Sequence, residues 1–81
     1  MESIIVLTIW GRDGNPMISM YLGEGTLDDF KNSPVYDKLD EIVEMAKEQY
    51  GDHMIKITIT TRLRVMLPAS SKDEIIWRRE E

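Results

Sequence analysis

The most regular pattern in this chain is the alternation of hydrophobic and polar residues between positions 54 and 67. Successive side chains of a β-strand point to opposite faces of its sheet. A strand here would therefore have one face that is almost wholly aliphatic and one that is polar and carries three cations. The aliphatic positions are Ile55, Ile57, Ile59, Leu63, Val65 and Leu67, and the opposite face would carry Met54, Lys56, Thr58, Thr60, Arg62, Arg64 and Met66. The pattern predicts a sheet with one buried face.

A β-hairpin is predicted at the start of the chain. Residues 3–10 are apolar at both parities, which is typical of a central strand or one covered on both faces. Residues 11–16 form a turn, with Asp13 and Gly14 as its tightest point, and residues 17–22 return as a second strand.

The main helix is predicted over residues 34–50. Ser33 precedes Pro34 as a cap residue before a first-turn proline, and Gly51 supplies the stop. A shorter helical turn is expected just before it, with Thr26 as N-cap and Asp29 three residues later. Hydrophobic residues at helical spacing define the buried stripe of the main helix: Val35, Leu39, Ile42, Val43, Ala46 and Tyr50.

Residues 68–73 are then predicted as a connection and residues 75–79 as a last strand, with the charged end at 78–81 expected to fray. The order strand, strand, helix, strand, strand predicts one α+β domain over residues 1–81. It would be a small two-layer ββαββ fold, an antiparallel sheet with one main helix packed on one face. A straight strand over residues 54–67 would span about 45 Å. It should therefore bend near Thr60 and Thr61, or project and pair with something else.

The amino-acid composition restricts the classes of function that fit this chain. The chain has 15 acidic and 10 basic residues and a net charge of −5, which opposes general binding to nucleic acid. The absence of cysteine excludes disulfides and thiolate chemistry. His53, the single histidine, lies at the predicted helix–strand junction, where it fits a helix end or solvent better than a catalytic base. We expect no enzyme activity, cofactor or metal. The apolar run at 4–10 is too short to cross a membrane, so we expect a cytoplasmic protein.

One candidate surface is the outer side of the predicted helix, where carboxylates gather opposite the apolar stripe. Several are four residues apart, a spacing at which like charges destabilise a helix. The acids are either a solubilising face or a docking surface for a basic partner. The candidate residues are Asp37, Asp40, Glu41, Glu44 and Glu48.

The second candidate is the sheet face turned away from the helix, which would mix aromatic, methionine and basic side chains. Such a mixture is enriched at protein interfaces. The candidate residues are Trp10, Tyr21, Met54, Lys56, Arg62, Arg64 and Met66. Two other interpretations stay open: the C-terminal segment or a different register covers this face, or Trp10 and Tyr21 stack on single-stranded nucleic acid while the cations hold phosphates.

These observations predict a small non-enzymatic protein-interaction, inhibitor or accessory protein, a type common in viruses and mobile elements. Its partner would be a protein, for example a basic or nucleic-acid-binding complex. One alternative is a homodimer that uses the sheet face or the end of the 54–67 strand. The other is a single-stranded nucleic-acid binder that uses Trp10 and Tyr21 with Lys56, Arg62 and Arg64.

Overall fold

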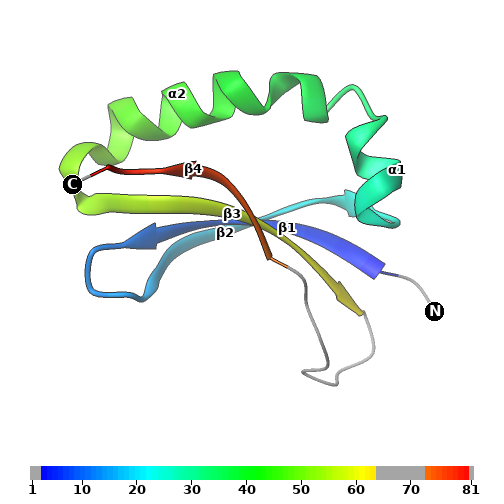
Figure 1. Ribbon diagram of the computed structural model, residues 1–81, viewed down its shortest axis with the longest axis horizontal. Helices are drawn as coiled ribbons and strands as arrows, with labels where there is room; N and C mark the ends of the chain where they lie inside the picture. The colour runs from blue at the N-terminus through cyan, green and yellow to red at the C-terminus, as the bar shows by residue number, and fades with distance from the viewer. Residues whose placement is uncertain (1–2, 64–72, 81) are drawn as a thin grey trace.

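The computed structural model of the 81-residue chain describes residues 3–63 and 73–80 (Figure 1). The four strands form one antiparallel sheet in the order β2-β1-β3-β4, and the main helix packs on it. The predicted ββαββ fold is therefore confirmed. The elements are β1 (Ser3–Gly11), β2 (Pro16–Glu24), α1 (Leu27–Lys31), α2 (Leu39–Tyr50), β3 (Met54–Leu63) and β4 (Asp73–Arg78), with 3-10 turns at Tyr36–Lys38 and Gly51–His53.

The core lies between the helix and the two central strands. In the β1–β3 pair, Leu7 stands opposite Ile59 and Ile9 opposite Ile57, so the aliphatic positions of both strands share one face. Burial of each such side chain contributes about 1.5–3 kcal/mol. The buried cluster consists of Ile5, Leu7, Ile9, Phe30, Leu39, Val43, Ala46, Met54, Ile57 and Ile59.

The β1–β2 turn forms where the sequence predicts it. Gly14 has a φ of 85°, a left-handed conformation that glycine adopts without steric cost. Its N–H donates to the carbonyl of Gly11 at 3.1 Å. The Asp13 carboxylate accepts the N–H of Asn15 at 3.0 Å and closes the turn from the side.

The helix ends were predicted with mixed success. Thr26 caps α1 and forms a reciprocal capping box with Asp29, as expected. The predicted cap at Ser33 and helix start at Pro34 are wrong, because the Ser33 hydroxyl donates to the carbonyl of Phe30 at 2.7 Å and does not cap the main helix. α2 follows a 3-10 turn and begins at Leu39. It ends at Gly51, whose φ of 53° and N–H bond to Lys47 confirm the predicted stop.

Met54 corrects the predicted face assignment. β1 and β3 change register between Trp10, which pairs with Lys56, and Gly11, which pairs with Met54. Ile55 is thus the extra residue of a β-bulge in β3. The residue before it, Met54, therefore points to the opposite face from the one that strict alternation predicts. Met54 is fully buried in the core, so it cannot belong to the sheet face away from the helix.

α2 does not cover the whole sheet. Its residues share a cleft with β4, and Lys47 of α2 lies over the ring of Trp77 on β4. At the opposite edge, Ile18 and Met20 of β2 are 39% and 37% exposed, although the parity of the strand predicts that they meet the helix. Parity assigns a face to a side chain but does not say which strands the helix covers. Across the described residues, no helix is long and apolar enough to span a membrane.

Candidate interaction surfaces

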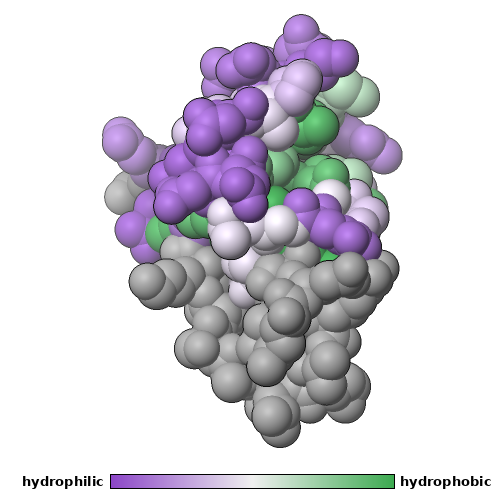
Figure 2. Space-filling view, turned by 90° about the vertical axis from the view of Figure 1, so that its right-hand side faces the viewer, coloured by the Kyte–Doolittle hydropathy of each residue, from purple (hydrophilic) through white to green (hydrophobic). Residues whose placement is uncertain are grey.

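The predicted acidic residues form one exposed surface on the helical segment. All five of Asp37, Asp40, Glu41, Glu44 and Glu48 are exposed, and we call them the acidic surface. Glu44 pairs with Lys47 at 3.1 Å, and it is the one member with an ion pair among the described residues. The upper part of Figure 2, where α2 lies, is mainly hydrophilic. The acidic surface therefore carries carboxylates that are largely uncompensated by the described part of the chain.

A cleft of about 480 Å³ adjoins the acidic surface, between the first half of α2 and β4. Asp37 and Asp40 line it from the helical side, and Glu74 lines it from the strand. Glu74 also pairs with Lys31 of α1 at 3.4 Å. The remaining lining residues are Tyr36, Leu39, Val43, Ile75 and Ile76. The lining thus combines acidic side chains with some hydrophobic ones, but most of its open surface is polar, and Leu39 and Val43 are buried in the core. Such a site suits the cationic end of a long basic side chain.

The sheet face away from the helix is less open than predicted. Thr8, Thr58 and Thr60 at its centre are buried. The indole N–H of Trp10 donates to the hydroxyl of Thr58 at 2.9 Å, and the Lys56 ammonium lies 5.2 Å from the centre of the Trp10 ring. Two of the predicted binding side chains are therefore engaged with each other and with the sheet. This arrangement leaves the Trp10 ring less free to stack on a base than the sequence suggested.

The other predicted residues of this face are dispersed. Tyr21 pairs with Val6, which places it on this face, but it stands on the edge strand β2 and is 59% exposed. Arg62 pairs with Ile4 near the end of β3. Arg64 and Met66 lie outside the described residues, as does the end of the predicted 54–67 strand.

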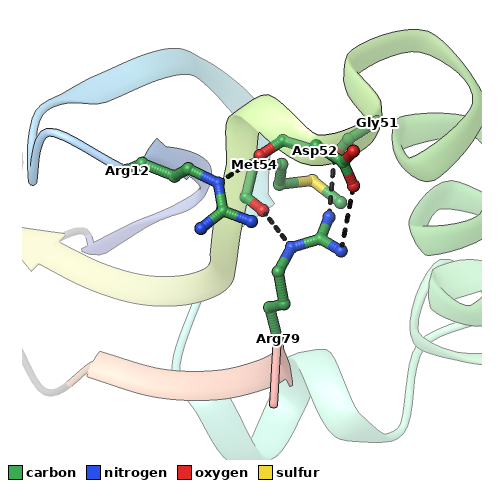
Figure 3. Close-up of polar contacts among 5 residues, drawn as sticks. All are labelled: Arg12, Gly51, Asp52, Met54 and Arg79. Atoms are coloured by element: carbon green, nitrogen blue, oxygen red, sulfur yellow. Dashed lines mark hydrogen bonds and ion pairs between the residues drawn. The ribbon is translucent and has the colours of Figure 1, made fainter. Parts of the chain in front are cut away.

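An arginine cluster that was not predicted from the sequence links the β1–β2 turn and the segment after β4 to the junction between α2 and β3 (Figure 3). The Arg79 guanidinium donates to the carbonyls of Met54 at 2.9 Å and Gly51 at 2.7 Å, and it lies 3.6 Å from the Asp52 carboxylate. Arg12, from the β1–β2 turn, donates to the Asp52 carbonyl. Two arginines thus satisfy carbonyls at the end of α2, where helices leave such groups unpaired. This cluster has a structural role.

Arg79 lies inside the segment that was expected to fray. Its N–H donates to the carbonyl of Ile55 at 2.9 Å, and its guanidinium lies 5.2 Å from the centre of the Trp77 ring. Lys47 approaches the same ring at 5.7 Å. The one sequence signal for this arrangement is the adjacency of Trp77 to two arginines, and that adjacency does not specify which carbonyls or carboxylates the arginines contact.

The described residues contain no candidate metal site, because they include no group of three or more histidine or acidic side chains that could hold a metal. His53 is exposed, and its carbonyl accepts the N–H of Arg12 at 3.2 Å. Asp13 has a lowered pKa, caused first by the backbone N–H of Asn15 and then by the amide side chain of the same residue. Both causes lie within a turn and serve its geometry.

Comparison of the chain with protein-family models, with curated proteins and with solved structures gives no match.

Proposed function

We propose that this domain is a non-enzymatic protein-interaction module that binds a basic segment of another protein through the acidic surface and the cleft beside β4. The observation that carries the proposal is the position of exposed carboxylates at the rim of a cleft. Asp37 and Asp40 belong both to the acidic surface and to the cleft.

The chemistry favours arginine or lysine as the side chain that enters. Its cationic head would meet the carboxylates at the rim, and its methylene stem would contact the smaller, hydrophobic part of the lining. An arginine could also donate two parallel hydrogen bonds to one carboxylate, which gives direction as well as attraction. A purely solubilising face needs no cleft beside its charges. An inhibitor or accessory protein that masks a basic surface of its partner would use such a site.

The repulsion within the acidic surface is consistent with this role. Asp40 and Glu44, and likewise Glu44 and Glu48, are four residues apart in α2. Each such pair costs about 0.2–0.5 kcal/mol. A cationic partner would relieve that repulsion on binding, so the stability lost by the free protein would return in the complex.

The test is a titration with arginine-rich and lysine-rich peptides, followed by calorimetry at low and moderate salt. We expect binding that weakens as salt increases, because exposed charge pairs are screened. The double variant Asp37→Asn/Asp40→Asn should weaken it about tenfold or more.

The matched control is Asp28→Asn/Glu80→Gln. It removes the same charge from exposed residues outside the acidic surface, so it should weaken binding by less than about threefold through the net charge alone. Equal losses in the two double variants would show that only net charge matters, and absence of salt-sensitive binding would refute the proposal.

A further inference from the structure

Among the described residues nothing pairs with the outer edge of β2, and the middle of this edge lacks the features that usually prevent strands from pairing. β2 is the outer strand next to β1, and residues 15–23 contain no charged side chain. Natural edge strands are commonly protected by charges, prolines or bulges. Pro16 is the first residue of β2, and the register shifts that mark bulges in the β1–β2 pair fall on either side of residues 18–21. The regular segment between them can accept another strand.

The segment is self-complementary about Ser19. In an antiparallel pair of identical strands related by a two-fold axis through the sheet, residues that face each other lie on the same side of it. With Ser19 on the axis, Ile18 of one copy stands opposite Met20 of the other, and the reverse holds across the axis. Ile18 and Met20 pair with Ile9 and Leu7, so both lie on the helix side, and both are more than one third exposed.

The flank of α2 that faces β2 is also compatible with a second copy. The opposite flank faces β4, because Asp40 lines the cleft beside β4 and Lys47 lies over Trp77 of that strand. At 100° per residue, the β2 flank carries Lys38, Ile42, Met45 and Gln49. It has no carboxylate, and Met45 is 66% exposed. Two chains with a net charge of −5 each can thus meet here without opposing their acidic surfaces.

From this geometry we infer that the chain forms a two-fold dimer in which β2 pairs antiparallel with β2 of a second copy, centred on Ser19. The dimer doubles the four-stranded sheet and keeps both α2 helices on one face. It goes beyond the proposed function, because it uses a different surface. It would present two acidic surfaces on the same face of the doubled sheet, and a partner with two basic segments would then bind with avidity.

A cysteine placed on the axis tests the register directly, because the chain has no cysteine of its own. Opposed residues in antiparallel strands are about 4.5–5.5 Å apart between Cα atoms, within the range that a disulfide spans. Ser19→Cys should therefore give a covalent dimer on mild oxidation at micromolar concentration. Ile75→Cys, on the exposed face of the other edge strand, should stay largely monomeric. Cross-linking of Ile75→Cys but not Ser19→Cys would overturn the inference.

Molar mass in solution tests it without relying on any variant. Light scattering coupled to size exclusion should give the mass of two 9.4 kDa chains, with dissociation on dilution. Ile18→Lys should raise the dimer dissociation constant at least tenfold, since a charge on the edge opposes pairing. The control Ile75→Lys should leave the dimer dissociation constant unchanged. A wild-type monomer up to hundreds of micromolar, or a dimer that Ile18→Lys leaves intact with the fold retained, would overturn the inference.

Discussion

The two edges of the sheet are built differently. β4 is tied to the rest of the molecule by side chains from three directions: Lys31 reaches Glu74, Lys47 lies over Trp77, and Arg79 follows the strand into the end of α2. β2 is held by its pairing with β1, and Ile18 and Met20, on the helix side of the sheet, are partly exposed. Charged side chains protect the β4 edge, whereas residues 15–23 at the β2 edge carry none. The protected edge borders the proposed cleft for a basic segment, and the open edge is suited to a strand.

The largest expected effect on stability comes from removing the Arg79 side chain, which anchors the end of β4 to the end of α2. Arg79→Ala should lower the free energy of unfolding by about 2–3 kcal/mol, because it removes charged hydrogen bonds to the carbonyls of Met54 and Gly51. Urea denaturation at a fixed chain concentration measures it. The control is Arg78→Ala, whose side chain is exposed, and it should change stability by less than about 0.5 kcal/mol. Similar losses in both variants would mean that the arginine cluster does not anchor this edge.

A smaller difference in stability is expected between substitutions on the two flanks of α2. Lys47→Ala removes the contact with Trp77 and the pair with Glu44, and it should cost about 0.5–1 kcal/mol. Lys38→Ala, on the β2 flank, should cost nothing, because a cation near a helix N-terminus is itself unfavourable. Thermal unfolding of both variants measures the difference. If Lys38→Ala cost as much, the contrast between the flanks would be wrong.

Charge reversal on the acidic surface should raise the stability of the domain while it weakens the binding of basic peptides. Glu48→Lys replaces the repulsive pair with Glu44 by an attractive one near the helix C-terminus, so it should add about 0.3–0.5 kcal/mol to the free energy of unfolding. The same change should weaken binding of basic peptides. Glu48→Gln, which only removes the repulsion, should fall between Glu48→Lys and the wild type in both measurements. A destabilised Glu48→Lys variant would show that repulsion on this surface is negligible.

The smallest effect concerns the turn that leads into β2. The pKa of Asp13 lies below its usual value of 3.8, because the N–H of Asn15 stabilises the charged carboxylate. A lowered pKa in the folded state means that this stabilisation is fully present above the usual pKa and is lost as the pH falls through the folded-state pKa. An NMR titration of the Asp13 carboxyl should show the low pKa, and Asn15→Gly, which removes the side-chain amide, should raise it part of the way. A folded-state pKa at or above 3.8 would contradict the turn geometry.

Local rules explain why much of the fold could be predicted. The apolar run of β1, the alternation in β3, the capping box at Thr26, the turn at Gly14 and the stop at Gly51 each depend on a few neighbouring residues. The acidic surface could also be predicted, because residues on the outer side of an amphipathic helix are fixed by its period once the buried stripe is known.

The errors occurred where two segments meet. Met54 lies in the core because β3 has a bulge opposite Gly11, and a bulge depends on both strands of the pair. Ile18 and Met20 have the parity of core residues, but α2 leans toward β4 and leaves them partly open. The outer sheet face was expected to be an open mixture of aromatic and basic residues, yet Trp10 is bonded to Thr58 across the β1–β3 pair.

The order of elements, the buried stripe of the helix and the gathering of carboxylates on one surface are all encoded locally in the amino-acid sequence. Each follows from the period of a single helix or strand and from residues close together in the chain. Which edge of the sheet is protected, which lies open and where the cleft forms beside the acidic surface are instead properties of the folded chain. They depend on the position of α2 over the strands and on contacts such as Arg79 with Gly51, between residues far apart in the sequence. No local pattern specifies such contacts, because they arise from the packing of the whole chain.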